Sequence, residues 1–103
     1  MEFFELSEQE YQDYWNNHPL KTFLSSPEIG KLRAKRNWNV NYVGIKDNNI
    51  IYGAAMLLSK KKKLNSYEFY SPRGFLIDYN NEELLNYFSK EIIKYIKNKK
   101  GYI

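Results

Sequence analysis

Apolar and aromatic residues recur at helical spacing soon after a short apolar run at 3–6. Ser7 and Glu10 form a capping box at the start of this segment, because each can satisfy a backbone N–H of the other. We therefore expect a first helix from Ser7 to about Asn17. Pro19 ends it, since the residue before a proline avoids helical geometry. The inward positions of this helix are Tyr11, Tyr14 and Trp15.

A second helix is predicted by Ser26-Pro27-Glu28. The serine can cap the first backbone N–H groups, proline suits the first helical position, and the carboxylate suits the positive end of the helix dipole. This helix is expected to reach about Arg36. Ile29 and Leu32, three residues apart, are predicted to face inward.

From Trp38 the apolar period changes to two, which predicts strands. Two β-rich runs, at about 38–46 and 50–59, flank the polar cluster 47–49, so we expect them to form a hairpin. The second run is almost continuously apolar, as in a central strand covered on both faces. Gly53 within it is equally consistent with a β-bulge.

A third strand is expected at about 67–70, after a lysine run at 60–63. We interpret this run as the soluble tip of a hairpin, with attraction to tRNA or lipid headgroups as the lesser alternative. Leu76-Ile77 can extend the sheet briefly. A last helix then begins, capped by Asn80 or Asn81, and Gly101 is a plausible stop. Its predicted buried stripe is Leu84, Leu85, Phe88, Ile92, Tyr95 and Ile96.

The expected order is β-α-α-β-β-β-α, an α+β fold with an antiparallel meander. This is the order of the first half of a GNAT-like acyltransferase subdomain, so residues 1–103 are expected to form one domain with that half fold. Tyr102-Ile103 is expected to open a further strand that is cut off after two residues. The exposed sheet edge would then allow self-association.

Composition narrows the chemistry. The 103 residues contain no cysteine and one histidine, His18, which excludes disulfides, thiolate metal sites and histidine clusters. No apolar run is long enough to span a membrane and no signal peptide is evident, so we expect a cytoplasmic protein. A net charge of +4 favours anionic partners without selecting among them.

One constrained turn lies between two apolar segments, at Tyr70-Ser71-Pro72-Arg73-Gly74. Pro72 and Gly74 bracket Arg73, and a guanidinium on a tight turn is suited to an anionic oxygen pair. An arginine in such a turn is also common without any function. The turn alone therefore does not assign a role to Arg73, and the surrounding motifs have to be considered with it.

These motifs together resemble the Fem family of aminoacyltransferases, the peptidoglycan-bridge enzymes. The resemblance covers nearly all of the chain in colinear order, and its most specific part is the turn followed by Asp78. Phe75 stands where the family usually has proline, and Ser25 and Ile29 also depart from the usual pattern. The matching blocks are Phe4-Glu5-Leu6-Ser7 with Glu10, Phe23 to Glu28, Trp38 with Tyr42 to Lys46, and Tyr70 to Gly74 with Asp78-Tyr79.

The resemblance implies transfer of an amino acid from aminoacyl-tRNA to the side-chain amine of a peptidoglycan precursor, either lipid II or its soluble nucleotide-linked form. Family members are several times longer and contain two GNAT-like subdomains, of which this chain would supply the first half of the first. We therefore expect it to form part of the precursor groove and to be inactive alone. The enzyme would be cytoplasmic, with a peripheral contact to the cytoplasmic membrane face as a further expectation.

The resemblance also implies site residues. In the family, a basic residue of the second helix contacts the diphosphate of the precursor, and the two candidates here are Lys31 and Arg33. Tyr70, Arg73 and Gly74 are the candidates from the turn. No residue is a convincing catalytic base, and no metal is implied. His18 is interpreted as a loop residue, Asp78 as a turn or cap ligand, and the aromatic residues mainly as core.

Two other functions compete with this interpretation. Acetyl transfer from coenzyme A needs a glycine-rich turn that holds a pyrophosphate at a helix start. The junction before the last helix has no glycine and carries Asp78, Glu82 and Glu83, which repel anions. Neither coenzyme A nor another cofactor is therefore expected. The second alternative is a small basic binding module with the same half fold and no enzymatic role.

Overall fold

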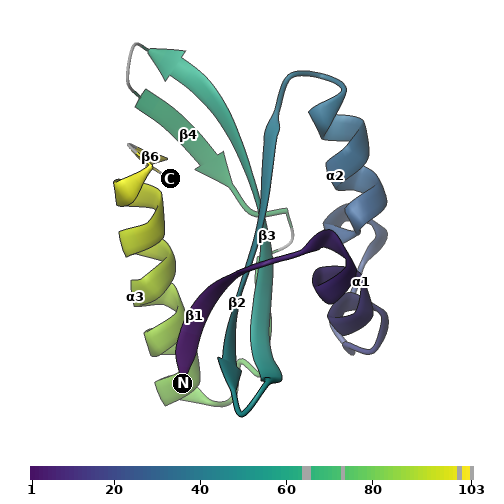
Figure 1. The fold of residues 1–103 in the computed structure, drawn as a ribbon, viewed down its shortest axis with the longest axis vertical. Coiled ribbons are helices and arrows are strands. Elements are labelled where there is room, and N and C mark those ends of the chain that lie inside the picture. The colour runs from purple at the N-terminus through teal and green to yellow at the C-terminus, as the bar shows by residue number, and fades with distance from the viewer. Residues whose placement is uncertain (64–65, 73, 100, 103) are drawn as a thin grey trace.

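A six-stranded sheet carries helices on both faces within the described part of the chain (Figure 1). The computed structural model describes residues 1–63, 66–72, 74–99 and 101–102. The strands are β1 Glu2–Leu6, β2 Asn39–Asp47, β3 Ile50–Lys63, β4 Ser66–Tyr70, β5 Leu76–Ile77 and β6 Gly101–Tyr102. The helices are α1 Glu8–Asn16, α2 Pro27–Ala34 and α3 Glu82–Asn98, and a 3-10 helix spans Phe23–Ser25.

The sheet order is β1-β2-β3-β4-β6, and the short β5 pairs with β3. The α+β class and the antiparallel meander are confirmed. The sixth strand pairs with β4 in parallel, with Gly101 beside Tyr67. Gly101 is therefore part of a strand rather than only a stop after α3, and the expected further strand begins there; Ile103 lies outside the described residues. None of the described helices has both the length and the apolarity needed to cross a membrane.

The β2–β3 hairpin closes through two asparagines in left-handed backbone conformation. Asn48 and Asn49 have φ of 50° and 66°, as a type I′ turn requires. Past the turn, Lys46 pairs with Ile51 but Ile45 pairs with Gly53, so one extra residue is inserted in β3. The predicted hairpin is confirmed, and the irregularity directly precedes the Gly53-Ala54-Ala55 segment, where a bulge was the alternative to a regular central strand.

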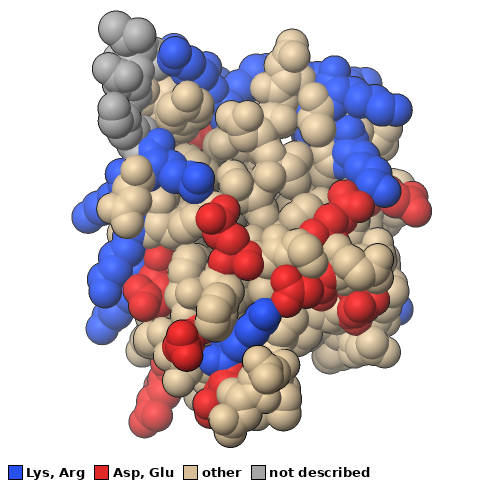
Figure 2. Space-filling model, viewed as in Figure 1, with Lys and Arg blue, Asp and Glu red and all other residues tan. Residues whose placement is uncertain are grey.

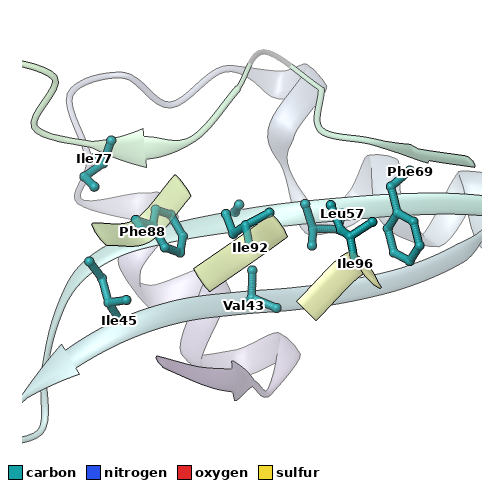
Figure 3. Packing of buried hydrophobic residues seen from close by; sticks show 9 residues of the cluster. Val43, Ile45, Leu57, Phe69, Ile77, Phe88, Ile92 and Ile96 are labelled. Carbon is teal, nitrogen blue, oxygen red and sulfur yellow. The ribbon is translucent and has the colours of Figure 1, made fainter. Parts of the chain in front are cut away.

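Strand β3 lies at the centre of the fold and is buried on both faces from Ala54 to Ser59. On one face, α3 packs against a cluster that we call the α3-face cluster (Figure 3). On the other face, α1 and α2 pack against the α1/α2-face cluster. The α3-face cluster comprises Val43, Ile45, Ala55, Leu57, Phe69, Ile77, Phe88, Ile92 and Ile96. The α1/α2-face cluster comprises Leu6, Tyr11, Tyr42, Ala54, Met56, Leu58 and Leu76.

The lysine run is not a hairpin tip, contrary to our expectation. β3 continues through Lys63, and Lys60 and Lys61 pair directly with Glu68 and Tyr67 of β4. The cross-strand partner with opposite charge offsets the repulsion within the run. The register places Lys60 on the α1/α2 face with Leu58, and Lys61 on the opposite face.

All three helix starts are confirmed. The Ser7 hydroxyl accepts from the Glu10 N–H at 3.0 Å and Glu10 accepts from the Ser7 N–H at 2.9 Å. Ser26 caps α2, and Asn81, the second of the two candidates, caps α3 by accepting from the Leu84 N–H. The prediction that Leu32 faces inward was wrong. Leu32 is 53% exposed, because α2 presents Ile29 and Gly30 to the sheet instead.

The capping box continues into an ion pair, which gives a prediction on pH. Lys46 Nζ lies 2.6 Å from Glu10 Oε2, and this hydrogen bond is the main cause that lowers the pKa of Glu10 below 4.5. A lowered pKa in the folded state stabilises the protein above pH 4.5, and this contribution disappears as pH falls through the folded pKa. Lys46→Met should therefore cost about 1 kcal/mol of unfolding free energy at pH 7. Urea unfolding should show a smaller difference in unfolding free energy between Lys46→Met and the unsubstituted chain at pH 3 than at pH 7. An equal difference at the two pH values would contradict the prediction.

Candidate functional site

Helix α2, which carries both basic candidates, lies close against the sheet because it has a glycine at the contact. Gly30 is buried, and a Cβ placed there would lie 2.6 Å from Tyr42 Oη and 3.1 Å from Met56 Sδ. Any side chain at position 30 would therefore hold α2 further from β2 and β3. The position of the basic residues at the end of α2 depends on this close approach.

The end of α2 is a Schellman motif that joins Arg33 to Trp38. The Trp38 N–H donates to the Arg33 carbonyl at 3.1 Å, and the Asn37 N–H donates to the Ala34 carbonyl at 3.2 Å. Asn37 adopts the left-handed conformation that this motif requires, with φ of 69°. The chain therefore reverses at a fixed angle, and the Trp38 side chain returns beside the last turn of the helix.

Arg33 is held on the face of Trp38. Its guanidinium carbon lies 5.6 Å from the centre of the indole ring, within the range of a cation–π contact. The residue is half-buried, and Trp38 packs against the α1/α2-face cluster. A guanidinium fixed in this way loses little conformational entropy when it binds a ligand, and its donors suit two oxygens of one phosphate.

Lys31 points elsewhere. Its Nζ lies 3.5 Å from Glu8 Oε2, on α1, and both side chains are largely exposed. A lysine that already faces a carboxylate is a weaker anion contact than one without a counter-ion. The structure therefore separates two residues that the sequence could not rank.

Two hydrogen bonds join Ser71 to Gly74 across the predicted turn. The Gly74 N–H donates to the Ser71 carbonyl at 3.1 Å, and the Ser71 hydroxyl donates to the Gly74 carbonyl at 3.2 Å. Gly74 has a φ of 74°, which favours glycine. Tyr79 closes the following segment by accepting from the Phe75 N–H and donating to its carbonyl. Arg73, the cation that this turn would present, lies outside the described residues.

Tyr70 ends β4 opposite Leu58 and is 49% exposed. Within the described residues, no hydrogen bond, ion pair or cation–π contact joins Tyr70 or Gly74 to Arg33 or Lys31. The described structure therefore brings Arg33 and Trp38 together, and has no such contact between either basic residue and Tyr70 or Gly74.

The other titratable candidates have local roles. His18 Nδ1 accepts from the Leu20 N–H, and burial lowers the pKa of His18, which favours the neutral ring. Asp78 accepts from the Asn80 N–H. The predicted roles of both residues in the loop and the turn are confirmed. Burial raises the pKa of Tyr14 to about 12, so its hydroxyl keeps its proton at neutral pH, and it donates to the Leu76 carbonyl at 3.3 Å.

Comparison with known proteins gives consistent matches. The model of the FemAB family matches residues 6–103. Aminoacyltransferase FemA of Staphylococcus aureus, strains MW2 and NCTC 8325 / PS 47, is 34% identical over 98 residues, which are 94% of this chain and 23% of FemA. The crystal structure of FemX superposes with a TM-score of 0.85 at 28% identity, over 99% of this chain and 26% of FemX. The chain thus spans about a quarter of the length of these relatives.

Proposed function

Because the chain belongs to the FemAB family, we propose that it is part of an aminoacyltransferase of cell-wall synthesis. The enzyme would transfer an amino acid from aminoacyl-tRNA to the stem-peptide amine of a peptidoglycan precursor, and so build an interpeptide bridge. The observation that carries this proposal is the 34% identity to FemA, an aminoacyltransferase, over nearly the whole chain. Residues 1–103 would form the first half of a GNAT-like subdomain and one wall of the precursor groove.

Arg33, rather than Lys31, is the proposed contact to the diphosphate of the precursor. Stacking on Trp38 orients the guanidinium before the ligand arrives, whereas Lys31 would first have to leave Glu8. Charge-assisted hydrogen bonds from arginine to phosphate are among the strongest available to a protein. The Tyr70–Gly74 turn is proposed as a second edge of the same groove.

The chemistry of the reaction agrees with a binding role for this chain. An aminoacyl ester is already activated, so its transfer requires mainly that the attacking amine is positioned and loses a proton. Tyr14 and His18, the titratable groups discussed above, are both engaged in hydrogen bonds within the chain. Coenzyme A is not proposed as a donor, because Asp78, Glu82 and Glu83 are exposed around the start of α3 and would repel its pyrophosphate.

Titration with the nucleotide-linked precursor tests this function. Arg33→Ala should weaken binding about tenfold, because a hydrogen bond to a charged group contributes about 1.5–3 kcal/mol. Lys31→Ala, on the same helix and with the same change in charge, should stay within about twofold of the unsubstituted chain. Calorimetry gives both affinities, and a transfer assay with radiolabelled aminoacyl-tRNA should show no turnover by the chain alone.

Two results would contradict the proposal. Equal losses for the two variants would show that only net charge matters and would remove Arg33 from the site. Turnover above background would show that the chain holds a catalytic group of its own.

A further inference from the structure

A second cation lies over the indole ring that carries Arg33. Lys60 Nζ lies 5.2 Å from the centre of the Trp38 ring, and the Arg33 guanidinium carbon lies 5.6 Å from it. The two residues come from different elements, since Arg33 ends α2 and Lys60 lies in β3. Trp38 therefore contacts one cation from a helix and one cation from a strand.

The carboxylate opposite Lys60 forms an ion pair with another lysine. Glu68 lies opposite Lys60 in the β3–β4 register, but the ion pair of Glu68 is with Lys62, at 3.9 Å. In the part of the chain that the structure describes, Lys60 forms no ion pair, and it is exposed to solvent. Its head group can therefore contact a ligand without first breaking a salt bridge.

The two ring distances set an upper limit on the separation of the two cations. The Arg33 carbon and Lys60 Nζ are at most 10.8 Å apart, which is the sum of 5.6 and 5.2 Å. Each charge-assisted hydrogen bond to a phosphoryl oxygen takes up about 2.8 Å of this distance. A diphosphate, in which one bridging oxygen joins two phosphoryl groups, has a length suited to reaching both cations within this limit.

The surrounding surface strengthens the attraction for anions but does not select among them. Figure 2 shows basic side chains gathered over the end of the molecule where α2 ends and the β3–β4 hairpin projects, with most acidic side chains below. Lys35 and Arg36 follow the described end of α2 and are exposed. Such a field draws in any anion, so only the paired cations can distinguish a diphosphate from a single phosphate.

We propose that Lys60 is a second anion contact, which binds one phosphoryl group of a diphosphate ester while Arg33 binds the other. The proposal rests on the proposed function, since it adds a residue to the same site. The paired contact also predicts that the chain binds a diphosphate more tightly than a single phosphate, because a single phosphate can form its full set of contacts with only one of the two cations. The ester can be nucleotide-linked or lipid-linked, since both carry the same diphosphate.

Calorimetry with inorganic pyrophosphate and orthophosphate tests the paired contact. Lys60→Ala should weaken pyrophosphate binding about tenfold, the effect of one lost charged contact, and abolish the preference over orthophosphate. Lys60→Arg should retain most of the affinity. Lys61→Ala is the matched control: it removes the same charge one residue away but from the opposite face of the sheet, so affinity should change by less than about twofold.

The outcomes separate this proposal from the proposed function. If Arg33→Ala weakens precursor binding while Lys60→Ala does not, Lys60 is not a contact and the proposed function stands. If Lys60→Ala and Lys61→Ala have equal effects, the patch acts only through its net charge and the paired contact is wrong. In the unsubstituted chain, tighter binding of uridine diphosphate than of pyrophosphate supports the nucleotide-linked ester. Lys60-dependent association with vesicles that carry a polyprenyl diphosphate supports the lipid-linked one.

Discussion

Phe88→Ala should lower the free energy of unfolding by about 3–5 kcal/mol, the largest effect that we expect from one substitution. Phe88 is fully buried in the α3-face cluster, between the sheet and the rest of α3 (Figure 3). Its ring also contacts Phe3 and Phe75, with centroid distances of 6.3 and 5.2 Å. Removing the ring leaves a cavity between three segments of the chain, and these segments cannot all move inward to fill it. For a domain of this size, the loss is a large part of the total stability.

Urea unfolding measures this loss, and Ile93→Ala is the control. Ile93 lies on the same helix but is 45% exposed, so its truncation changes the helix in a similar way without opening a cavity. We expect Ile93→Ala to cost less than about 1 kcal/mol. Similar losses for the two variants would show that α3 is not anchored by Phe88.

Gly30→Ala should destabilise the protein, although alanine favours a helix by about 1 kcal/mol over glycine. The new Cβ would lie 2.6 Å from Tyr42 Oη. Tyr42 cannot move aside, because its ring is stacked on buried Tyr11 with a centroid distance of 4.6 Å. Helix α2 must then lift away from the sheet, and such overpacking costs about 1–3 kcal/mol. After the gain in helix propensity is subtracted, the net loss should be up to about 2 kcal/mol.

A double-mutant cycle with Tyr42→Phe identifies the clash. In that background the closest atom is gone, so Gly30→Ala should cost less than it does in the unsubstituted chain. The same substitution should weaken precursor binding, because it displaces the helix that carries Arg33. Equal costs in both backgrounds would mean that α2 does not rest on Tyr42.

The elements that could be predicted from the sequence are those specified by neighbouring residues. Ser7, Ser26 and Asn81 cap helices within three residues of themselves, and the asparagines at 48 and 49 close the hairpin with their own backbone conformation. Each of these signals is local, so no knowledge of the rest of the fold was needed.

The predictions that were wrong concern residues whose environment depends on residues distant in sequence. Leu32 has the spacing of a buried residue, but Gly30 permits close contact with Tyr42 on another face of α2, and Leu32 is left in solvent. The lysine run has the composition of a loop, but pairing of Lys60 with Glu68 keeps it in β3. Cross-strand partners are separated in sequence, so composition alone could not show them.

In the candidate site, too, the sequence could not show contacts between residues that are distant along the chain. Family resemblance reduced the anion contact to Lys31 or Arg33, and only the positions of Glu8 and Trp38 separate them. The lysine run was interpreted as a soluble tip, with attraction to tRNA or lipid headgroups as the lesser alternative, and the proposed contact at Lys60 was not singled out because four lysines in a row look uniform in sequence. The signal was available in the alternation from Leu58 onward, which places Lys60, but not Lys61, on the side of the sheet that faces α2.

The Schellman motif has a practical consequence for protein engineering. The carbonyl of Arg33, the left-handed Asn37 and the indole of Trp38 all lie within residues 33–38, so the backbone reversal that joins the guanidinium to the indole is encoded in one short peptide. A graft of this peptide onto another junction between a helix and a strand would carry the reversal with it. The new scaffold would need to supply an apolar surface on which the indole packs, as the α1/α2-face cluster does here, and a second charge.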